Sequence, residues 1–412
     1  MRVIPKVAIT GAAVVALVGI GMGNALADPY ATPSVTDIVG VGSDTITPLY
    51  DGGVNVKDAG TFVTDFNAQS PAPSSLLWSW DAVNGTSTSI VTKPGCAAIT
   101  RPNGSSAGIA ALNLNTKLSN GDFCIDFARS SRAPKAVVSG TNGPDAFAVL
   151  AGDGITWTSP APKTGQTSPV PVTLTVAQMA MIYTCQANGT SFNWDQFGGK
   201  NATIVPVLPQ NGSGTRSTFL AALGNGVNNP LVPGPCVVNG SNASGVIEEN
   251  TGVSSTGFGN TAQFDPGGTP AVADIFPYSI GDYIAQGSNE GTYSGRAIGG
   301  HTTPDFGHGV MVLRKSNGTN ATSISNKPPY ARATVISPSF TPALRRILYN
   351  VVRNAGTATA PKFPTTPTYE ANMSKIFGPT GWECTATAAK SDIASYGFLL
   401  EGRSCGALSA GS

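Results

Sequence analysis

One stretch of the chain, residues 204–223, reads as a strand, a tight turn and a helix in immediate succession. Ile204 to Leu208 is an apolar run of strand length, Asn211 to Gly214 is typical of a turn, and residues 217–223 have the apolar pattern of a helix. Further strand-like runs lie at residues 35–41, 76–80 and 309–313, with stretches of helical periodicity between them. Strands that alternate with helices predict an α/β fold built in layers.

The composition restricts this fold further. Gly (50) and Pro (31) make up about a fifth of the 412 residues, which indicates many turns and short elements and excludes coiled coils and helical bundles. One helix start is legible, because Thr175 and Gln178 have the spacing of a capping box. A chain of this length exceeds the size at which a single core keeps growing, so we expect two lobes.

The first 27 residues predict export. Arg2 and Lys6 precede an uncharged stretch from Val7 to Met22, and Ala25-Leu26-Ala27 follows as a small-x-small cleavage site. We therefore expect a signal peptide at residues 1–27 and an exported protein, periplasmic or at the cell surface. No cysteine lies at the cleavage site, so we expect no lipid anchor.

All six cysteines follow the expected signal peptide. An even number of cysteines outside the cytosol favours disulfides, and six cysteines allow fifteen pairings. We expect sequential pairing, because each bond then closes one local loop: Cys96 with Cys124, Cys185 with Cys236, and Cys384 with Cys405. A structural zinc site is the alternative, but no two cysteines have CxxC spacing and both histidines, His301 and His308, lie far from them in sequence.

The charged residues are few and balanced. Lys plus Arg number 24 and Asp plus Glu number 23, and only 11% of the residues are charged. Nucleic-acid-binding proteins concentrate Lys and Arg on one face, so we expect no nucleic-acid partner. Four short segments instead place hydroxyl residues in a turn, three of them together with glycines: 42–45, 104–108, 128–132 and 212–216. Such turns before helices direct N–H and O–H donors at one point, which suits a small oxyanion, although each alone is more often a simple helix cap.

The segment at residues 212–216 is the most specific of the four. Arg216 lies in the first turn of the helix, where a cation is unfavourable unless it has a negative partner. Its planar guanidinium suits bidentate binding of a tetrahedral anion, and the alternative is a pair with a surface carboxylate. The segment is not a nucleotide-binding P-loop, because no Gly-Lys-Ser/Thr follows at the required spacing.

Three of these segments resemble the phosphate-binding proteins that serve ABC importers. Residues 40–50 (GVGSDTITPLY) resemble that family's opening Gly-x-Gly-x-Thr-Phe-x-x-Pro-x-Tyr segment. Residues 126–131 (DFARSS) resemble its Asp-Phe-x-x-Ser-Asp segment, and residues 211–219 (NGSGTRSTF) resemble its Gly-Ser-Gly-Thr loop. The resemblance, which covers roughly residues 35–350, implies two α/β lobes of the periplasmic-binding-protein type, joined by crossover strands and closing on one anion.

The resemblance also implies boundaries, ligand and site. We expect one lobe from residues 28–148 and 300–412 and the other from residues 149–299. The implied protein is a monomer that binds inorganic phosphate, or a related oxyanion, for an ABC permease, with no cofactor, no metal and no catalytic residue. The residues implied to line the cleft are Ser43, Asp44, Thr45, Ser105, Ser106, Ser130, Ser131, Ser213, Gly214, Thr215 and Arg216.

The sequence departs from this family at three positions. Ser131 stands where the family has the Asp that accepts a proton from hydrogen phosphate, Pro209 where it has an Arg, and Asp44 where it has a Thr. Asp44 is a candidate acceptor for the proton of hydrogen phosphate in place of the missing Asp. Equally, its negative charge could repel a fully ionised ligand such as sulfate. Arg129 and Arg132 either compensate the lost charge or are exposed.

Two other functions fit parts of the sequence. Residues 104–108 match the Gly-x-Ser-x-Gly pattern of serine hydrolases, with Ser106 as nucleophile, a histidine in 300–309 as base and Asp274 or Asp282 as acid. The turn sequence 101–103 before it is not the buried strand that a nucleophile elbow requires. The missing lipid anchor favours instead a released surface or extracellular protein that keeps the binding fold without a transport role.

Overall fold

The computed structural model describes residues 28–51, 61–82, 88–136, 144–161, 167–186, 192–242, 245–250, 272–286, 311–324 and 334–412. The expected signal peptide, residues 1–27, lies outside the described residues. No helix within those ranges has the length and apolar character needed to cross a membrane.

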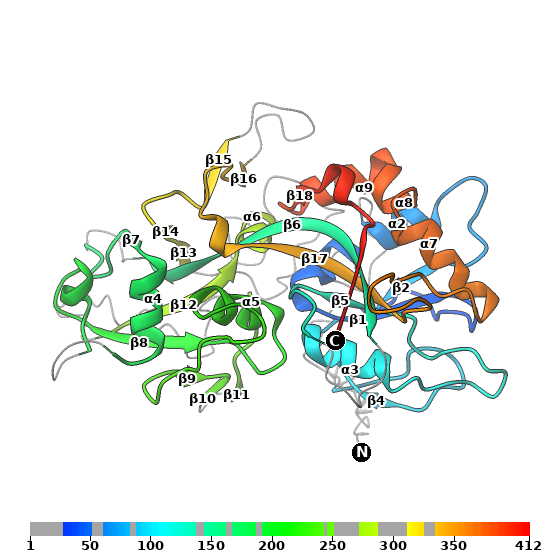
Figure 1. Cartoon of the computed structure of the whole chain (residues 1–412), viewed down its shortest axis with the longest axis horizontal. Helices are drawn as coiled ribbons and strands as arrows, with labels where there is room; N and C mark the ends of the chain where they lie inside the picture. Colours follow the sequence, from blue (N-terminus) through cyan, green and yellow to red (C-terminus); the bar gives the residue numbers. More distant parts are fainter. Residues whose placement is uncertain are drawn as a thin grey trace, which may run out of the picture.

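The chain forms two lobes that lie side by side (Figure 1). An eleven-stranded sheet, with main strand order β2-β1-β5-β17-β6-β12-β8-β9, passes through both. On this main path, the strands within each lobe pair in parallel, β1 with β2 and β5, and β8 with β12 and β9. The two strands in the middle, β6 (Asp145–Pro160) and β17 (Arg345–Val352), are antiparallel and cross from one lobe to the other. The predicted α/β class and the crossover strands are confirmed.

The first lobe holds the start and the end of the described chain. Its strands are β1 (Ile38–Gly42), β2 (Leu77–Ser79), β3 (Ser89–Ile90), β4 (Ile99–Thr100), β5 (Phe127–Ser130), β18 (Leu399–Leu400) and β19 (Leu408–Gly411). Its helices are η1 (Asp44–Ile46), α1 (Thr47–Asp51), α2 (Phe62–Asn67), α3 (Ser105–Asn113), η5 (Thr368–Ala371), α7 (Asn372–Phe377), α8 (Trp382–Thr385), α9 (Thr387–Ser395) and η6 (Gly402–Ser404).

The second lobe is built from the middle of the chain. Its strands are β7 (Thr173–Leu174), β8 (Thr203–Leu208), β9 (Val238–Asn239), β10 (Ser241–Asn242), β11 (Gly245–Val246), β12 (Val272–Ser279), β13 (Met311–Leu313), β14 (Lys315–Ser316), β15 (Thr322–Ile324) and β16 (Thr334–Ile336). Its helices are α4 (Val176–Tyr183), η2 (Trp194–Phe197), α5 (Gly214–Leu223), α6 (Ile280–Gln286) and η4 (Pro342–Leu344).

Each lobe has its own hydrophobic core. The core of the first lobe packs β1, β2 and β5 against α2 and the C-terminal helices, with Phe127 and Phe377 in ring contact. The core of the second lobe packs α4, α5 and β8, and it also contains Ile336 and Leu344. Because those two residues belong to the second core, we propose that the second lobe extends to residue 344 and not to the expected boundary at 299.

Local sequence accounts for the helices that position the site. Thr175 caps α4 with the expected capping box, in which its Oγ1 accepts from Gln178 N and Gln178 Oε1 accepts from Thr175 N. Ser213 caps α5, and its Oγ accepts from Arg216 N at 3.0 Å. This cap lies in the segment that the sequence predicted as a turn before a helix. These caps determine where each helix begins and therefore where its free N–H groups point.

The predicted disulfide pairing is confirmed. Cys96 bonds Cys124, Cys185 bonds Cys236, and Cys384 bonds Cys405. The separations are 28, 51 and 21 residues, so each bond closes a loop within one lobe. Such bonds stabilise a chain with many turns by restricting its unfolded state.

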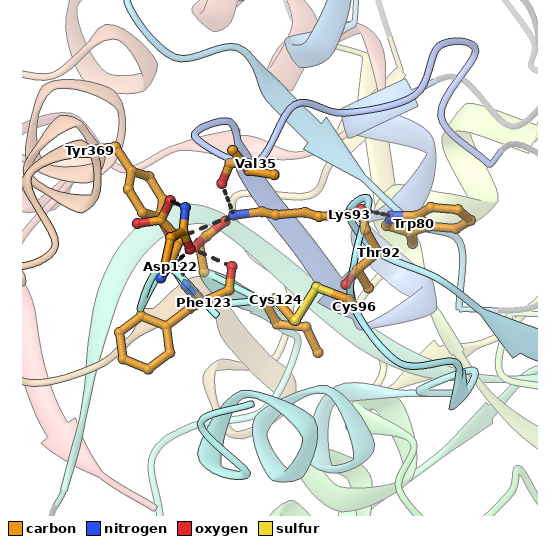
Figure 2. The surroundings of a disulfide bond; sticks show 12 residues. Val35, Trp80, Thr92, Lys93, Cys96, Asp122, Phe123, Cys124 and Tyr369 are labelled. Carbon is orange, nitrogen blue, oxygen red and sulfur yellow. Dashed lines mark hydrogen bonds and ion pairs between the residues drawn. A yellow bond between two sulfur atoms is a disulfide. The ribbon is translucent and has the colours of Figure 1, made fainter. Parts of the chain in front are cut away.

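A buried ion pair beside the first disulfide fixes the strands that lead to the site. Figure 2 shows Lys93 next to Cys96 and Cys124, with Nζ donating to Val35 O at 3.3 Å. Nζ also lies 2.7 Å from Asp126 Oδ2, and both side chains are fully buried. The same carboxylate accepts from Val39 N at 2.7 Å, which ties β1 to the residue before β5. The ends of β1 and β5 are thereby held in register.

Candidate anion-binding site

Hydroxyl side chains from three elements of the first lobe meet at one point. Ser43 follows β1, Ser131 follows β5 and Ser105 begins α3, and all three are fully buried. Ser43 Oγ donates to Ser131 Oγ at 2.9 Å, and the Ser105 and Ser131 hydroxyl oxygens are 3.3 Å apart. Since β1 and β5 are parallel neighbours, their carboxyl ends meet at the same edge of the sheet. The sequence predicted these residues as lining the cleft, and the structure brings them together.

The N-terminus of α5 faces this cluster from the second lobe. A Cβ on Gly214, the first residue of α5, would overlap the hydroxyl oxygens of Ser131 and Ser105. Glycine is therefore required for the helix end to approach so closely. Thr215 in the same turn is fully buried, and its Oγ1 is 3.4 Å from Thr45 Oγ1 of the first lobe.

Further hydrogen bonds cross directly between the lobes. Ser106 N donates to Gly212 O at 3.1 Å, and Gln210 Nε2 donates to Asn103 Oδ1 at 2.7 Å. Thr218 Oγ1 donates to Ser131 O at 3.1 Å. The structure is thus a closed arrangement, in which the two lobes touch around the hydroxyl cluster.

Arg346 supplies the positive charge at the centre of the site. It lies on the crossover strand β17, and its guanidinium donates from Nη1 to Thr215 Oγ1 at 3.1 Å and from Nη2 to Thr45 Oγ1 at 3.4 Å. Its other edge is fixed by Asp153 on β6, whose Oδ2 is 2.8 Å from Nε and 2.7 Å from Nη2. Arg346 is not among the residues predicted from the sequence. Its only sequence signal is the Arg345-Arg346 pair at the start of a strand in a chain that has few charges.

A carboxylate also lies in the site. Glu249 is fully buried and follows the β10–β11 hairpin of the second lobe. Its Oε2 accepts from Thr215 N at 2.9 Å and, at short range, from the hydroxyl of Ser213. Its Oε1 accepts from Thr45 N at 3.4 Å and from Thr45 Oγ1 at 3.3 Å. The sequence analysis missed this residue too, and the adjacent acidic pair Glu248-Glu249 in a segment rich in Gly, Asn and Ser was the available signal.

Two predicted residues face away from the cluster. Arg129 is fully buried inside the first lobe, where its guanidinium donates to Ser43 O, Thr47 Oγ1 and Trp80 O. It therefore connects β1, α1 and β2 instead of providing charge to a ligand. Ser130 Oγ donates to Arg132 O at 2.9 Å, so that hydroxyl closes a local turn.

The remaining predicted residues lie at the edge of the cluster. Arg216 Nη1 donates to Pro209 O at 3.0 Å, and partial burial lowers the pKa of this guanidinium. Ser106 Oγ accepts from Arg132 Nε at 3.1 Å. Asp44 is half-buried in the first turn of η1, one residue from Ser43 and Thr45.

The described residues also bear on the two alternatives raised from the sequence, a serine hydrolase and a metal site. Ser106 lies in the first turn of α3 after Gly104, the N-cap, and its hydroxyl is bonded to an arginine as described above. His301 and His308 lie outside the described residues. Within the described ranges, no group of three or more His, Cys, Asp or Glu side chains is placed to hold a metal ion.

The chain is similar to several known proteins. A family model described as "PBP superfamily domain" matches residues 68–334. No curated protein matches the chain. Among solved structures, an ABC-type phosphate transport receptor from Vibrio cholerae is 15% identical, with a TM-score of 0.44 and coverage of 88% of this chain and 99% of that chain. A phosphate-binding protein from Stenotrophomonas maltophilia is 13% identical, with a TM-score of 0.44 and coverage of 89% and 91%.

Proposed function

This chain belongs to the PBP superfamily, and from that premise we propose that it captures an inorganic oxyanion, phosphate in particular, between its two lobes. The proposal concerns binding without covalent chemistry. The protein is proposed to be exported and monomeric and to deliver its ligand to an ABC permease that recognises the closed lobes.

The observation that carries the proposal is the convergence of donors on one buried point. The hydroxyls of Ser43 and Ser105 each lie within hydrogen-bonding distance of the Ser131 hydroxyl, and the guanidinium of Arg346 donates to Ser131 O and to Thr215 Oγ1 in the N-terminal turn of α5. A group of buried N–H and O–H donors beside a helix N-terminus and a fixed guanidinium suits a small anion. A carboxylate already accepts four hydrogen bonds there, which supports the anionic character of the ligand.

Phosphate is the ligand that the sequence resemblance favours. The segments at residues 40–50, 126–131 and 211–219 that carry this resemblance include Ser43, Ser131 and Ser213, which are members of the observed cluster or cap the adjacent helix. Asp44 stays the predicted acceptor for the proton of hydrogen phosphate. Such an acceptor would favour phosphate and arsenate over sulfate, which carries no proton at neutral pH.

Calorimetric titration of the exported form tests the proposal. The protein is first unfolded and refolded to remove any anion, and is then titrated with phosphate, arsenate and sulfate. We expect one-to-one binding of phosphate and arsenate and no binding of sulfate. A folded sample that binds none of the three anions contradicts the proposed function.

A pair of adjacent serines gives a matched control. Ser131→Ala removes a hydroxyl from the cluster, whereas Ser130→Ala removes one that bonds the backbone of Arg132. We expect Ser131→Ala to weaken phosphate binding about tenfold, the scale of one hydrogen bond, and Ser130→Ala to change it much less. Equal effects of the two variants would place the ligand elsewhere.

A further inference from the structure

We propose that Glu249 is an internal ligand of the anion site, and that an external oxyanion binds by displacing its carboxylate. This inference rests on the proposed function, because it concerns the same donors. It assigns to Glu249 the role of setting the affinity of the site and of holding the lobes together when no anion is bound.

The hydrogen bonds of Glu249 are those that a tetrahedral anion would need. Oε2 uses the backbone N–H of Thr215 at the start of α5 and the hydroxyl of Ser213, the residue that caps this helix. Oε1 uses the backbone N–H and the hydroxyl of Thr45. The carboxylate therefore occupies donors from both lobes, as a bound oxyanion would.

In the closed cluster, these donors can bind only one anion at a time. Hydroxyls of the cluster are already bonded to one another, Ser43 to Ser131 and Thr45, a partner of Glu249, to Thr215. Gly214 lies so close to Ser131 that even a methyl group would overlap its hydroxyl. A second anion in contact with a buried carboxylate would also add like-charge repulsion. Binding of an external anion therefore requires the Glu249 side chain to leave.

The backbone around Glu249 is anchored, so displacement of its carboxylate requires the side chain itself to rotate. Ile247 O accepts from Gln210 N at 2.8 Å, before Glu249 in the chain. Asn250 Oδ1, after it, accepts from Ser279 N at 3.0 Å, and Tyr278 Oη donates to Asn250 O. Both anchors belong to the second lobe. Displacement is therefore a rotation of one side chain, and it breaks the contacts of Glu249 with Thr45 of the first lobe.

Substitution of the carboxylate tests this inference, with the preceding residue as control. Glu248 is also a partly buried carboxylate, but its Oε2 accepts from Asn103 Nδ2 at 2.8 Å, outside the hydroxyl cluster. We measure inorganic phosphate binding by calorimetry for wild type, Glu249→Gln, Glu249→Ala and Glu248→Gln. We expect both Glu249 variants to bind phosphate at least tenfold more tightly than wild type, and Glu248→Gln to stay within threefold of it.

The outcomes separate this inference from the proposed function. Tighter binding by the Glu249 variants, or binding by these variants alone, supports both. If wild type binds phosphate and both Glu249 variants bind it with equal or lower affinity, the inference is overturned. The proposed function then stays intact, because Glu249 would remain beside the bound phosphate. No phosphate binding by any folded variant overturns the proposed function and the inference with it.

A ligand-free measurement provides a second readout. Because Glu249 connects the lobes, we expect small-angle X-ray scattering of anion-free Glu249→Ala to give a larger radius of gyration than anion-free wild type. The two radii should become equal when phosphate is added in excess. Equal radii without phosphate would contradict the role of Glu249 in closing the lobes.

Discussion

Replacement of Arg346 by methionine is expected to damage both the fold and the site, and the two effects can be separated. The guanidinium pairs with Asp153 Oδ2 at 2.7 Å, and both side chains are at most 2% exposed. Methionine keeps most of the side-chain volume and removes the charge. The change therefore leaves the Asp153 carboxylate buried without its cation.

The size of the stability loss follows from the contacts that remain. Asp153 would keep the neutral donors Ser279 Oγ at 2.8 Å and Gly281 N at 3.0 Å. Removing one partner of a buried ion pair costs about 3–5 kcal/mol, because the remaining charge is left in a medium of low polarity. We expect Arg346→Met to lower the free energy of unfolding by that amount.

A double variant distinguishes the lost pairing from the lost site. In Arg346→Met with Asp153→Asn neither side chain of this pair is charged, and the new amide oxygen can still accept from Gly281 N. We expect urea unfolding to show that the second substitution recovers at least half of the lost stability. Phosphate titration should nevertheless show no binding, because the donors to Thr45 and Thr215 are gone.

Two results would refute this reasoning. A loss of less than about 1 kcal/mol in Arg346→Met would mean that the Asp153 carboxylate does not depend on the guanidinium, since even exposed pairs contribute up to that amount. Wild-type phosphate affinity in the double variant would remove Arg346 from the site.

Two further predictions concern Glu383 and Gly214. Burial raises the pKa of the Glu383 carboxyl to about 8, while hydrogen bonds from Tyr50 and Asn350 act in the opposite direction. Between these two pKa values, the folded protein keeps a proton on Glu383 that the unfolded chain loses above the ordinary glutamate pKa of 4.5. The free energy of unfolding should therefore fall as the pH rises from about 5 to about 8, by at most about 5 kcal/mol. Urea unfolding against pH should show a smaller slope in Glu383→Gln, and an unchanged slope would contradict the assignment. Gly214→Ala should weaken phosphate binding tenfold or more by keeping α5 away from Ser131, and unchanged affinity in calorimetry would show that the lobes close without this contact.

Local patterns account for the parts of the fold and site that the sequence predicted. The strand, turn and helix at residues 204–223, the capping box at Thr175 and the disulfide pairs all depend on residues close together in the chain. Local patterns also predict that Ser43, Ser105 and Ser131 follow strands or begin a helix, but these residues meet only because β1 and β5 pair as parallel neighbours.

The residues that the sequence analysis missed reach the site through long-range pairing. Arg346 lies about 300 residues from Thr45 and is brought to it only because β17 crosses between the lobes beside β6. Glu249 depends on a hairpin whose place is fixed by contacts to Gln210. Arg216 was predicted to bind the anion because it lies in the first turn of a helix, yet its guanidinium donates to the carbonyl oxygen of Pro209. Neither strand order nor side-chain direction can be read from such local patterns.

The two central strands also determine how the lobes can move relative to each other. β6 and β17 stay paired from Gly154 with Arg345 to Ala146 with Val352, with one register shift between Leu348 and Tyr349. A pair of hydrogen-bonded strands bends and twists at low cost. It resists sliding, because sliding would break all the hydrogen bonds between the two strands. We therefore expect the lobes to move by bending and twisting of these strands and not by sliding. Arg346 lies on β17, so the residue that brings positive charge to the site also lies on a strand that connects the lobes.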